Sequence, residues 1–370
     1  MRRPSDVDAD FLTRIAPFIA IDGGRNLNEM SRELSIPYQT MRMRMLGLKD
    51  IGISVLAIPD LDKLGLERAK VFFELTPGTT KEIRAFFGGL HQSAGLRFYS
   101  RSMDSQIFDS EFVIPSGSFE ELTKLLEKLQ DLSMIQNVEC SKVLWRDVVP
   151  LRTKYYDYAK REWDVDFTKL SGNPSSVEIP EKSNPERIDY NDLFMIKELE
   201  LDAWIKLVEI ANKARMEIGD VAYHFNKHVL GKKLIKSFRL RWYGSKKTWL
   251  KHSVILKNYV FKGISDEGCR HAMSIFTSTP FTWVHMMIED HTYEVETMVP
   301  ISQYPEASQY VSTQLRNVGL KPTLVFEKDW SCSSTFTIPH LLYNKEDGRW
   351  KFNADHALDY TLQSIKTFAS

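Results

Sequence analysis

Hydrophobic residues between positions 189 and 230 recur at spacings of three and four, which is the period of one helix face. This pattern predicts three helices, at about 189–201, 206–215 and 218–230. The residues from 238 alternate between apolar and polar positions and lead into Gly-Ser-Lys-Lys at 244–247, as a strand does when it enters a basic turn. Three helices followed by a basic hairpin are typical of a winged helix.

The same pattern occurs near the start of the chain, so the sequence contains an internal repeat. The helices predicted there are 11–21, 28–34 and 37–46. When the two halves are superposed, Glu29 coincides with Glu209, and at a slightly larger offset Trp145 coincides with Trp330. Two copies this far apart indicate a duplicated two-domain unit, whereas a solenoid or propeller needs more and shorter repeats.

Strand and helix patterns follow each predicted winged helix. Residues 69–146 contain a strand, a helix, two strands, a helix and a strand, and residues 253–330 repeat this order. The βαββαβ order predicts a ferredoxin-like sandwich whose sheet exposes one face. The predicted fold class is α+β, with two copies of a winged helix-turn-helix followed by a ferredoxin-like βαββαβ domain. The predicted domains are winged helix 1 at 8–58, ferredoxin-like domain 1 with its extension at 66–167, a linker at 168–188, winged helix 2 at 189–248, and ferredoxin-like domain 2 with a closing helix at 250–370.

The composition fits a globular protein, because 43% of the residues are hydrophobic. No stretch approaches the roughly 18 apolar residues that a membrane span needs, and the first residues lack the apolar segment of a secretion signal. Cys140, Cys269 and Cys332 are separate and form no Cys-x-x-Cys motif, which argues against a disulfide framework and a cysteine zinc site. We therefore expect a cytoplasmic protein with no membrane partner.

The formal net charge is zero, but the charge is unevenly distributed. Residues 221–265 contain eleven Lys and Arg residues and no Asp or Glu. A solvated lysine-rich surface is one explanation of such a run. Its position in the third helix and the hairpin favours another, because in a winged helix the third helix enters the major groove and flanking cations contact phosphates. This pattern predicts double-stranded DNA as the partner.

The candidate DNA-binding residues are the polar positions of the two third helices and the cations of the second wing. Methionines at helical spacing, such as Met41 and Met45, are assigned to the core instead. Gln39 has the side chain that pairs with adenine, and Arg42 the one that pairs with guanine. The full set is Tyr38, Gln39, Thr40, Arg42, Arg44, Tyr223, His224, Asn226, Lys227, His228, Lys232, Lys233, Lys236, Arg239, Arg241, Lys246 and Lys247.

Motifs for catalysis and for cofactors are absent from the sequence. It contains no Gly-rich phosphate loop, no His-Glu-x-x-His and no Gly-x-Ser-x-Gly. His224 and His228 are four residues apart on one helix and could bind a metal, but no acidic or cysteine third ligand is near them in the sequence. Phosphate or base contact is the preferred interpretation of both. We expect no enzymatic activity, no cofactor and no metal.

The second copy resembles the Lrp/AsnC-like transcription regulators of archaea and bacteria. The residues that carry this resemblance are Asp189, Asp192, Ile196, Leu199, Asp202, Ala203, Glu209, Ile210 and Ala211, together with a linker-like segment at 58–66. The resemblance implies a winged helix-turn-helix joined to a ferredoxin-like domain. Members carry one such unit and dimerise, so this chain is similar to a covalent pseudo-dimer. The family's effector loop has a Gly ahead of an Asp, and Asp104 and Asp290 lie near the equivalent turns without that Gly.

The leading hypothesis from the sequence is a sequence-specific, double-stranded DNA-binding regulator of transcription that uses two winged helices on one chain. One alternative keeps the fold but makes the chain a replication-initiation or architectural factor, similar to the winged-helix initiator proteins of archaea. Another is a sensor that binds a small-molecule effector through the ferredoxin-like sheets. The same sheets offer a surface for homodimer formation.

Overall fold

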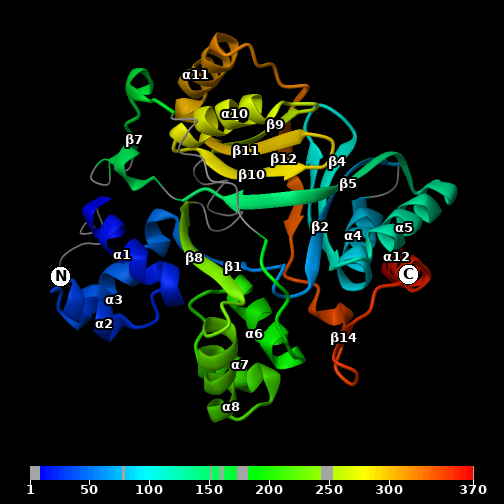
Figure 1. Cartoon of the computed structure of the whole chain (residues 1–370), viewed down its shortest axis with the longest axis horizontal. Coiled ribbons are helices and arrows are strands. Elements are labelled where there is room, and N and C mark those ends of the chain that lie inside the picture. The colour runs from blue at the N-terminus through cyan, green and yellow to red at the C-terminus, as the bar shows by residue number, and fades with distance from the viewer. Residues whose placement is uncertain are drawn as a thin grey trace.

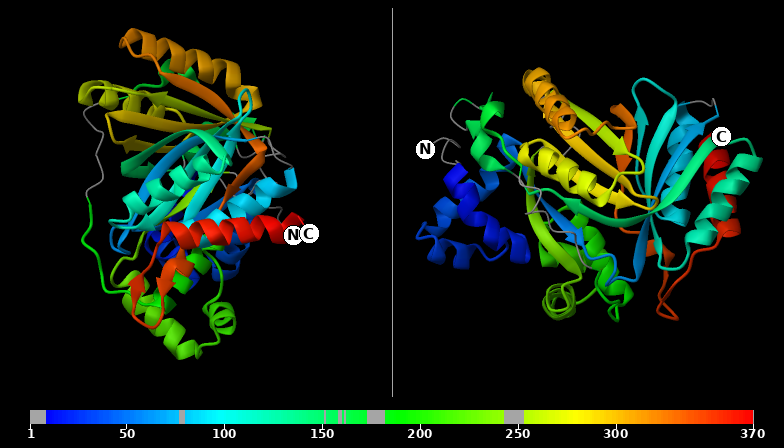
Figure 2. Two further views of the ribbon diagram at one scale, coloured as in Figure 1. Left: turned by 90° about the vertical axis from the view of Figure 1, so that its right-hand side faces the viewer. Right: turned by 45° about the horizontal axis from the view of Figure 1, so that its top comes forward.

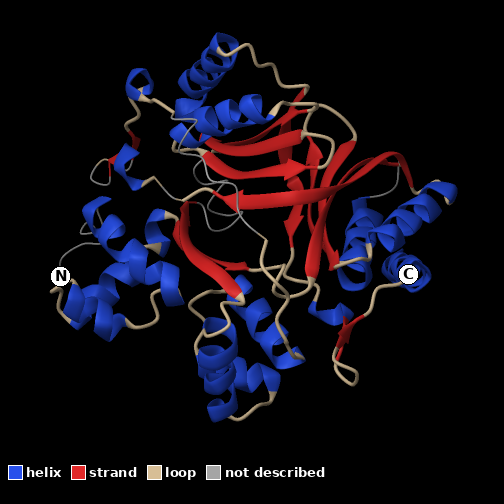
Figure 3. Ribbon diagram, viewed as in Figure 1, coloured by secondary structure: helices blue, strands red, loops and turns tan. Residues whose placement is uncertain are grey.

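Eight strands form a closed barrel in the computed structural model, which describes residues 9–76, 80–150, 152–157, 160, 162–172, 182–242 and 253–369 (Figures 1 and 3). Their order around the barrel is β10-β11-β9-β12-β3-β4-β2-β5. Each half of the chain supplies four neighbouring strands. The halves join at two seams, because β5 pairs antiparallel with β10 and β3 pairs antiparallel with β12.

The first half of the barrel has the order βαββαβ. Its elements are β2 (Leu66–Leu75), α4 (Thr80–Ala94), β3 (Leu96–Ser102), β4 (Ile107–Pro115), α5 (Phe119–Asp131) and β5 (Ile135–Val148). The C-terminal helix α12 (Ala354–Ala369) packs beside α4 and α5 (Figure 2). Gly89 of α4 permits this approach, because a Cβ at this position would lie 2.8 Å from the Cα of Thr361.

The second half repeats the order. Its elements are β9 (Val254–Phe261), α10 (Asp266–Ser278), β10 (Thr282–Ile288), β11 (Thr292–Pro300), α11 (Tyr304–Asn317) and β12 (Leu324–Thr335). Short elements connect the parts: η2 (Lys49–Ile51), η3 (Thr153–Tyr155), β6 (Tyr156–Asp157), β7 (Glu162–Trp163), η4 (Phe167–Lys169), η7 (Ile301–Gln303), η8 (His340–Leu342), β13 (Tyr343–Asn344) and β14 (Arg349–Trp350). Among the described residues, no helix combines the length and the apolar character needed to cross a membrane.

The helices cover the outside of the barrel, and the apolar residues of the strands face them. In β2, for example, Val71 and Phe73 belong to one hydrophobic cluster with residues of α4 and α5. Because successive strand residues point to opposite faces, Arg68 and Lys70 face the interior instead. The barrel therefore has an apolar exterior beneath its helices and a charged interior.

Two three-helix units lie outside the barrel on one side of it (Figures 1 and 2). The first contains α1 (Ala9–Asp22), α2 (Leu27–Glu33) and α3 (Tyr38–Gly47), and the second contains α6 (Tyr190–Leu201), α7 (Leu207–Ala214) and α8 (Ile218–Tyr223), which continues as a π-helical segment, η6 (His224–Leu230). A strand follows each unit, β1 (Ile53–Pro59) and β8 (Ile235–Trp242). These strands pair antiparallel with each other and form a two-stranded ribbon.

The predicted fold class was wrong in how its parts assemble. Two winged helices followed by separate ferredoxin-like sandwiches would leave each sheet with one exposed face, whereas the two four-stranded sheets close on each other into one barrel. Within the part of the chain that the structure describes, β8 pairs with β1 from the other unit and not with a strand that follows it. Alternation along a strand predicts that one face is polar, and a closed interior satisfies that pattern as well as solvent does.

Removal of one member of the interior ion-pair network is expected to destabilise the whole barrel. Asp109 is buried and accepts contacts from Lys70 at 2.5 Å and Lys328 at 2.9 Å. Asp109→Ala leaves both ammonium groups in the interior without this carboxylate, which should cost about 3–5 kcal/mol of unfolding free energy in urea titrations. Lys124→Ala, at a more exposed ion pair on α5, is the control and should change stability by less than about 1 kcal/mol. Equal effects of the two variants would contradict this account.

The stability of the folded chain should depend on pH through His285 of β10. Burial lowers the pKa of His285 from 6.5 to about 4, so the folded state keeps the ring neutral where the unfolded state takes up a proton. The contribution of His285 is therefore complete above pH 6.5 and is lost as the pH falls from 6.5 towards 4, by roughly 3 kcal/mol in total. Unfolding of wild type and His285→Gln between pH 7 and 4.5 should show a flatter profile for the variant. Parallel profiles would show that this ring does not set the dependence.

Candidate functional site

A cationic cavity of about 120 Å³ lies between the β1–β8 ribbon and the barrel interior. Its charged lining consists of six cations, Arg68, Lys70, Arg97, Arg146, Arg241 and Lys328, and two carboxylates, Glu111 and Glu296. Five of the cations come from barrel strands, and Arg241 comes from the ribbon. Apolar and aromatic side chains, including Trp283 and Trp330, complete the walls. We call this space the cationic cavity.

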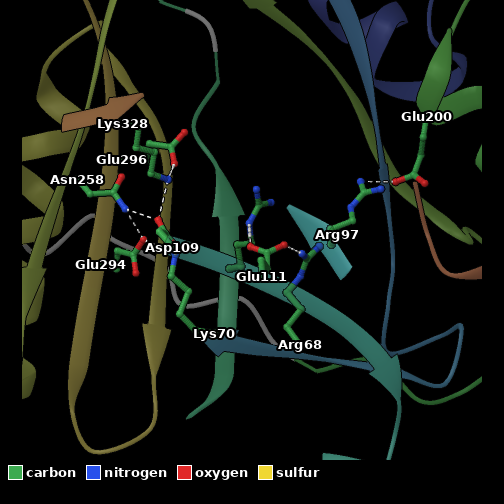
Figure 4. A network of polar contacts seen from close by, with 11 residues as sticks. Arg68, Lys70, Arg97, Asp109, Glu111, Glu200, Asn258, Glu294, Glu296 and Lys328 are labelled. Atoms are coloured by element: carbon green, nitrogen blue, oxygen red, sulfur yellow. Dashed lines mark hydrogen bonds and ion pairs between the residues drawn. The ribbon is translucent and has the colours of Figure 1, made fainter. Parts of the chain in front are cut away.

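One part of the network joins two arginines of the cavity through a single carboxylate (Figure 4). Glu111 forms an ion pair with Arg68, and its other oxygen lies 3.2 Å from Nε of Arg146. Burial acts to raise the pKa of Glu111, but these arginines hold it at about 2. Burial lowers the pKa of Arg68 to about 10, against the effect of Glu111. Both groups are therefore ionised at neutral pH.

A second part crosses from one half of the barrel to the other (Figure 4). Lys70 lies 2.6 Å from Glu294 and also contacts Asp109, while Lys328 contacts Asp109 and Glu296. Lys328 and Lys70 hold the pKa of Asp109 below its ordinary value against the effect of burial. Burial raises the pKa of Glu294 to about 7 in spite of Lys70. This carboxyl group can therefore exchange a proton near neutral pH.

Two further arginines connect the three-helix units to the cavity. Arg97 of β3 lies 2.6 Å from Glu200 of α6, and Glu200 also accepts a hydrogen bond from the backbone amide of Ile338 at 2.7 Å. Burial raises the pKa of Glu200, although Arg97 acts to lower it. Arg241 of β8 donates a hydrogen bond to Ser54 at 3.0 Å, and burial lowers its pKa to about 10. At neutral pH Arg241 is thus a charged guanidinium enclosed between ribbon and barrel.

Positive charge exceeds negative charge in this region. The six cations face the carboxylates of Asp109, Glu111, Glu200, Glu294 and Glu296, which leaves one positive charge when all five are ionised. Protonation of Glu294, whose pKa is about 7, increases the excess. Guanidinium groups bind carboxylates through paired N–H donors, and aromatic walls accept flat rings. The cavity is therefore suited to an anionic ligand that carries carboxylates.

A second cavity of about 150 Å³ lies beside the first and shares part of its wall. Arg68, Arg146 and Val148 line both spaces, and Lys142 and Lys236 line the second one. The two arginines therefore separate two small cavities. Movement of their side chains would join these spaces into one site under the ribbon.

The predicted DNA-binding residues are dispersed in the structure. Tyr38, Gln39, Thr40 and Arg42 on α3 are exposed, as are Tyr223, Asn226, Lys227, Lys233 and Lys236. Lys246 and Lys247 lie outside the described residues. The remaining candidates contact other parts of the chain.

These inward contacts include three of the eleven cations of residues 221–265, which we call the basic block. Arg44 lies over the ring of Phe11, and Lys232 donates a hydrogen bond to the backbone oxygen of Arg187. Arg239 pairs with Asp147 at 3.3 Å and donates to the backbone oxygen of Val148, and Arg241 lines the cationic cavity. His224 and His228 both turn towards Asp192. The wing arginines therefore face the barrel because β8 pairs with β1 across it.

The sequence prediction missed the interior residues of the barrel. Their signal was present, since charged residues two positions apart occur in strands that are otherwise apolar. The pairs are Arg68 and Lys70 in β2, Asp109 and Glu111 in β4, and Glu294 and Glu296 in β11. Such pairs mark one face of a strand, but only the closed barrel shows that these faces meet.

No protein-family model and no curated protein matches the sequence. Two crystal structures resemble nearly the whole chain. The siroheme decarboxylase NirDL is 10% identical, with a TM-score of 0.55, and the match covers 97% of this chain and 99% of that chain. The same enzyme in complex with an iron-uroporphyrin III analogue is 10% identical, with a TM-score of 0.52, and 93% of each chain is covered. At this identity the likeness concerns the fold.

The comparisons correct the family and function that the sequence predicted. The fold shared with siroheme decarboxylase NirDL is one closed barrel over the full length, which contradicts the predicted tandem Lrp/AsnC-like DNA-binding regulator built from separate winged helices and sandwiches. The expectation that the chain is not an enzyme also conflicts with these matches. The basic block misled the prediction because its arginines at 239 and 241 neutralise or line the interior instead of facing outwards.

Proposed function

We propose that the protein binds a tetrapyrrole carboxylic acid in the cationic cavity and removes carboxyl groups from it. The observation that carries the proposal is the cavity lining, where six buried or half-buried cations outnumber by one the five carboxylates around them. The full-length likeness to siroheme decarboxylase NirDL, one structure of which holds an iron-uroporphyrin III analogue, supports the choice of ligand class. The cations would hold carboxylates that stay on the ligand and so fix its orientation.

The apolar walls support the reaction type. Leu256, Met286 and Met298 line the same cavity as the cations. A carboxylate placed against such side chains loses hydration, and its charge disperses when the carbon–carbon bond breaks and carbon dioxide leaves. The electron pair left on the ligand takes up a proton, so the products are carbon dioxide and a C–H bond. A cavity lined by both cations and apolar side chains suits a ligand that keeps some carboxylates and loses others.

The size of the cavity sets a condition on binding. Ligand sites for drug-sized molecules occupy roughly 300–1,000 Å³, more than the cationic cavity of about 120 Å³ and its neighbour of about 150 Å³ offer separately. A macrocycle therefore requires the ribbon to move away from the barrel wall. The ribbon meets that wall through Arg239, which contacts Asp147 and Val148 at the rim.

Titration with iron-uroporphyrin, followed by the shift of its main absorption band, tests the proposal. Wild type should bind saturably, and Arg241→Met should bind on the order of 10- to 100-fold more weakly, because one charge-assisted contact to a carboxylate is lost. Lys124→Met, on the outer helix α5, is the control and should bind like wild type. A porphyrin with fewer carboxylates should bind more weakly than uroporphyrin.

The reaction is tested separately with siroheme as substrate and mass spectrometry of the product. Stepwise loss of carbon dioxide by wild type, reduced in Arg241→Met, is the expected result. An absence of saturable porphyrin binding, or equal binding by wild type and Arg241→Met, would overturn the proposed site. Binding without loss of carbon dioxide would overturn the reaction.

A further inference from the structure

We infer that the second three-helix unit holds a divalent transition-metal ion of the zinc type between α6 and the π-helical segment η6. The four ligands would be Asp189, Asp192, His224 and His228, whose ligand atoms all lie within 4.8 Å of one another. This inference does not depend on the proposed function, because the cluster lies outside the cationic cavity. We call these four residues the His–Asp cluster.

The two imidazole rings converge on one buried carboxylate. Nδ1 of His224 lies 2.8 Å from Oδ1 of Asp192, and Nδ1 of His228 lies 2.9 Å from the same oxygen. Asp192 is fully buried, and Oδ1 of Asp189 lies 3.8 Å from Nδ1 of His224. Ligands of a tetrahedral zinc site are about 3.3 Å apart, given Zn–N and Zn–O distances of about 2.0–2.1 Å. The measured separations bracket that value, so small movements would admit an ion.

The helix start fixes both acids of the cluster. Asp189 is the N-cap of α6 and accepts hydrogen bonds from the amides of Asn191 at 2.9 Å and Asp192 at 3.0 Å. In turn, the carboxylate of Asp192 accepts a hydrogen bond from the backbone amide of Asp189 at 3.2 Å. These bonds orient the carboxylates as second-layer contacts orient the ligands of metal sites.

The first three-helix unit shows that the fold does not need a polar cluster at this position. At the repeat offsets of 180 and 181 residues, Asp192 corresponds to Leu12 and Phe11, both buried apolar residues of α1. His224 falls at Arg44, whose guanidinium lies over the ring of Phe11. The first unit therefore packs at this position without a carboxylate or an imidazole. The second unit instead encloses a carboxylate and two imidazoles, an arrangement that costs stability unless their polar atoms are used.

A single inserted residue builds the His–Asp cluster. At the start of the third helix, Val221 corresponds to Met41. The amide of Met41 donates to the backbone oxygen of Pro37, and the amide of Val221 donates in the same way to that of Glu217. At the end of the third helix, Val229 corresponds to Leu48. The backbone oxygen of Leu48 accepts the amide of Ile53, and that of Val229 accepts the amide of Leu234, both at 2.9 Å. The second unit therefore contains one residue more than the first between these two points.

The extra residue lies in η6, where Gly231 bonds to the oxygen of Asn226, five residues back. Such π-helical turns are frequent at functional sites. Here the turn directs His228 as well as His224 at Asp192. The insertion thus changes the direction of a side chain that carries ligand chemistry.

The cluster is open on one side. Asp189, Asp192 and His228 line a cavity of about 590 Å³, and Lys232, Lys345 and Tyr343 form part of its other walls. An ion held by the cluster would be reached through this cavity. Catalytic zinc sites leave one coordination position of the ion open. Lys232 and Lys345 in the cavity wall would favour a hydroxide or another anion at such a position.

The test uses the full chain, freed of metal with a chelator, and Zn²⁺ alone in competition with a chromogenic chelator. Wild type should bind one Zn²⁺ per chain, and His224→Gln and His228→Gln should each bind at least 10-fold more weakly. His271→Gln is the matched control, because His271 sits four residues from an acid, Glu267, on a helix outside the cluster. Co²⁺ should give visible absorption bands of a nitrogen- and oxygen-ligated ion in wild type only.

Two results would overturn the inference. One is wild type that takes up no stoichiometric Zn²⁺. The other is Zn²⁺ binding that is the same in His224→Gln and His228→Gln as in wild type. Thermal unfolding with and without Zn²⁺ distinguishes an ion site from a purely hydrogen-bonded helix cap. If the cluster is only a cap, the variants are less stable than wild type, but Zn²⁺ does not change the unfolding temperature of wild type. Porphyrin binding by His224→Gln and His228→Gln should equal that of wild type. A failure of the metal inference therefore leaves the proposed porphyrin site to be tested by itself.

Discussion

The fold depends on pairing charges inside a closed barrel. Lys70 of the first half reaches Glu294 of the second, and Lys328 of the second half reaches Asp109 of the first. Each buried ion costs several kcal/mol of lost hydration, and that cost is offset only when an opposite charge is in contact. Neither half contains the complete set of partners. The two βαββαβ halves are therefore held together by interior ion pairs as well as by the strand pairing at the seams.

The ribbon follows from a similar constraint on backbone groups. β1 and β8 each end a three-helix unit, and each would expose unpaired amides if it stayed single. By pairing with each other they satisfy these groups and place Arg239 and Arg241 over the barrel. Both arginines of the basic block are thus used within the molecule. The same step makes the ribbon one wall of the cationic cavity.

Local order could be predicted from the sequence, and long-range pairing could not. The periods of apolar residues indicated the helices of the second unit and the strands around Lys70 and Glu294, because local periodicity depends on neighbours in the chain. Closure of the barrel depends on β3 meeting β12, which lies in the other half of the chain, and no local pattern encodes that contact. The His–Asp cluster was missed for the same reason, since Asp192 lies far ahead of His224 in the sequence and reaches it only through helix packing. A search for acids beyond the neighbouring residues would have found it.

Helix α6 connects the features of the second unit with the barrel. Asp192 in its first turn faces the two histidines, and Glu200 near its end holds Arg97 of the cationic cavity. The stretch of helix between these two acids spans about 12 Å, and a helix of this length moves as one body. Glu200 is buried at this contact and also accepts the backbone amide of Ile338, so the end of α6 is fixed against the barrel while its first turn faces the histidines of the second unit.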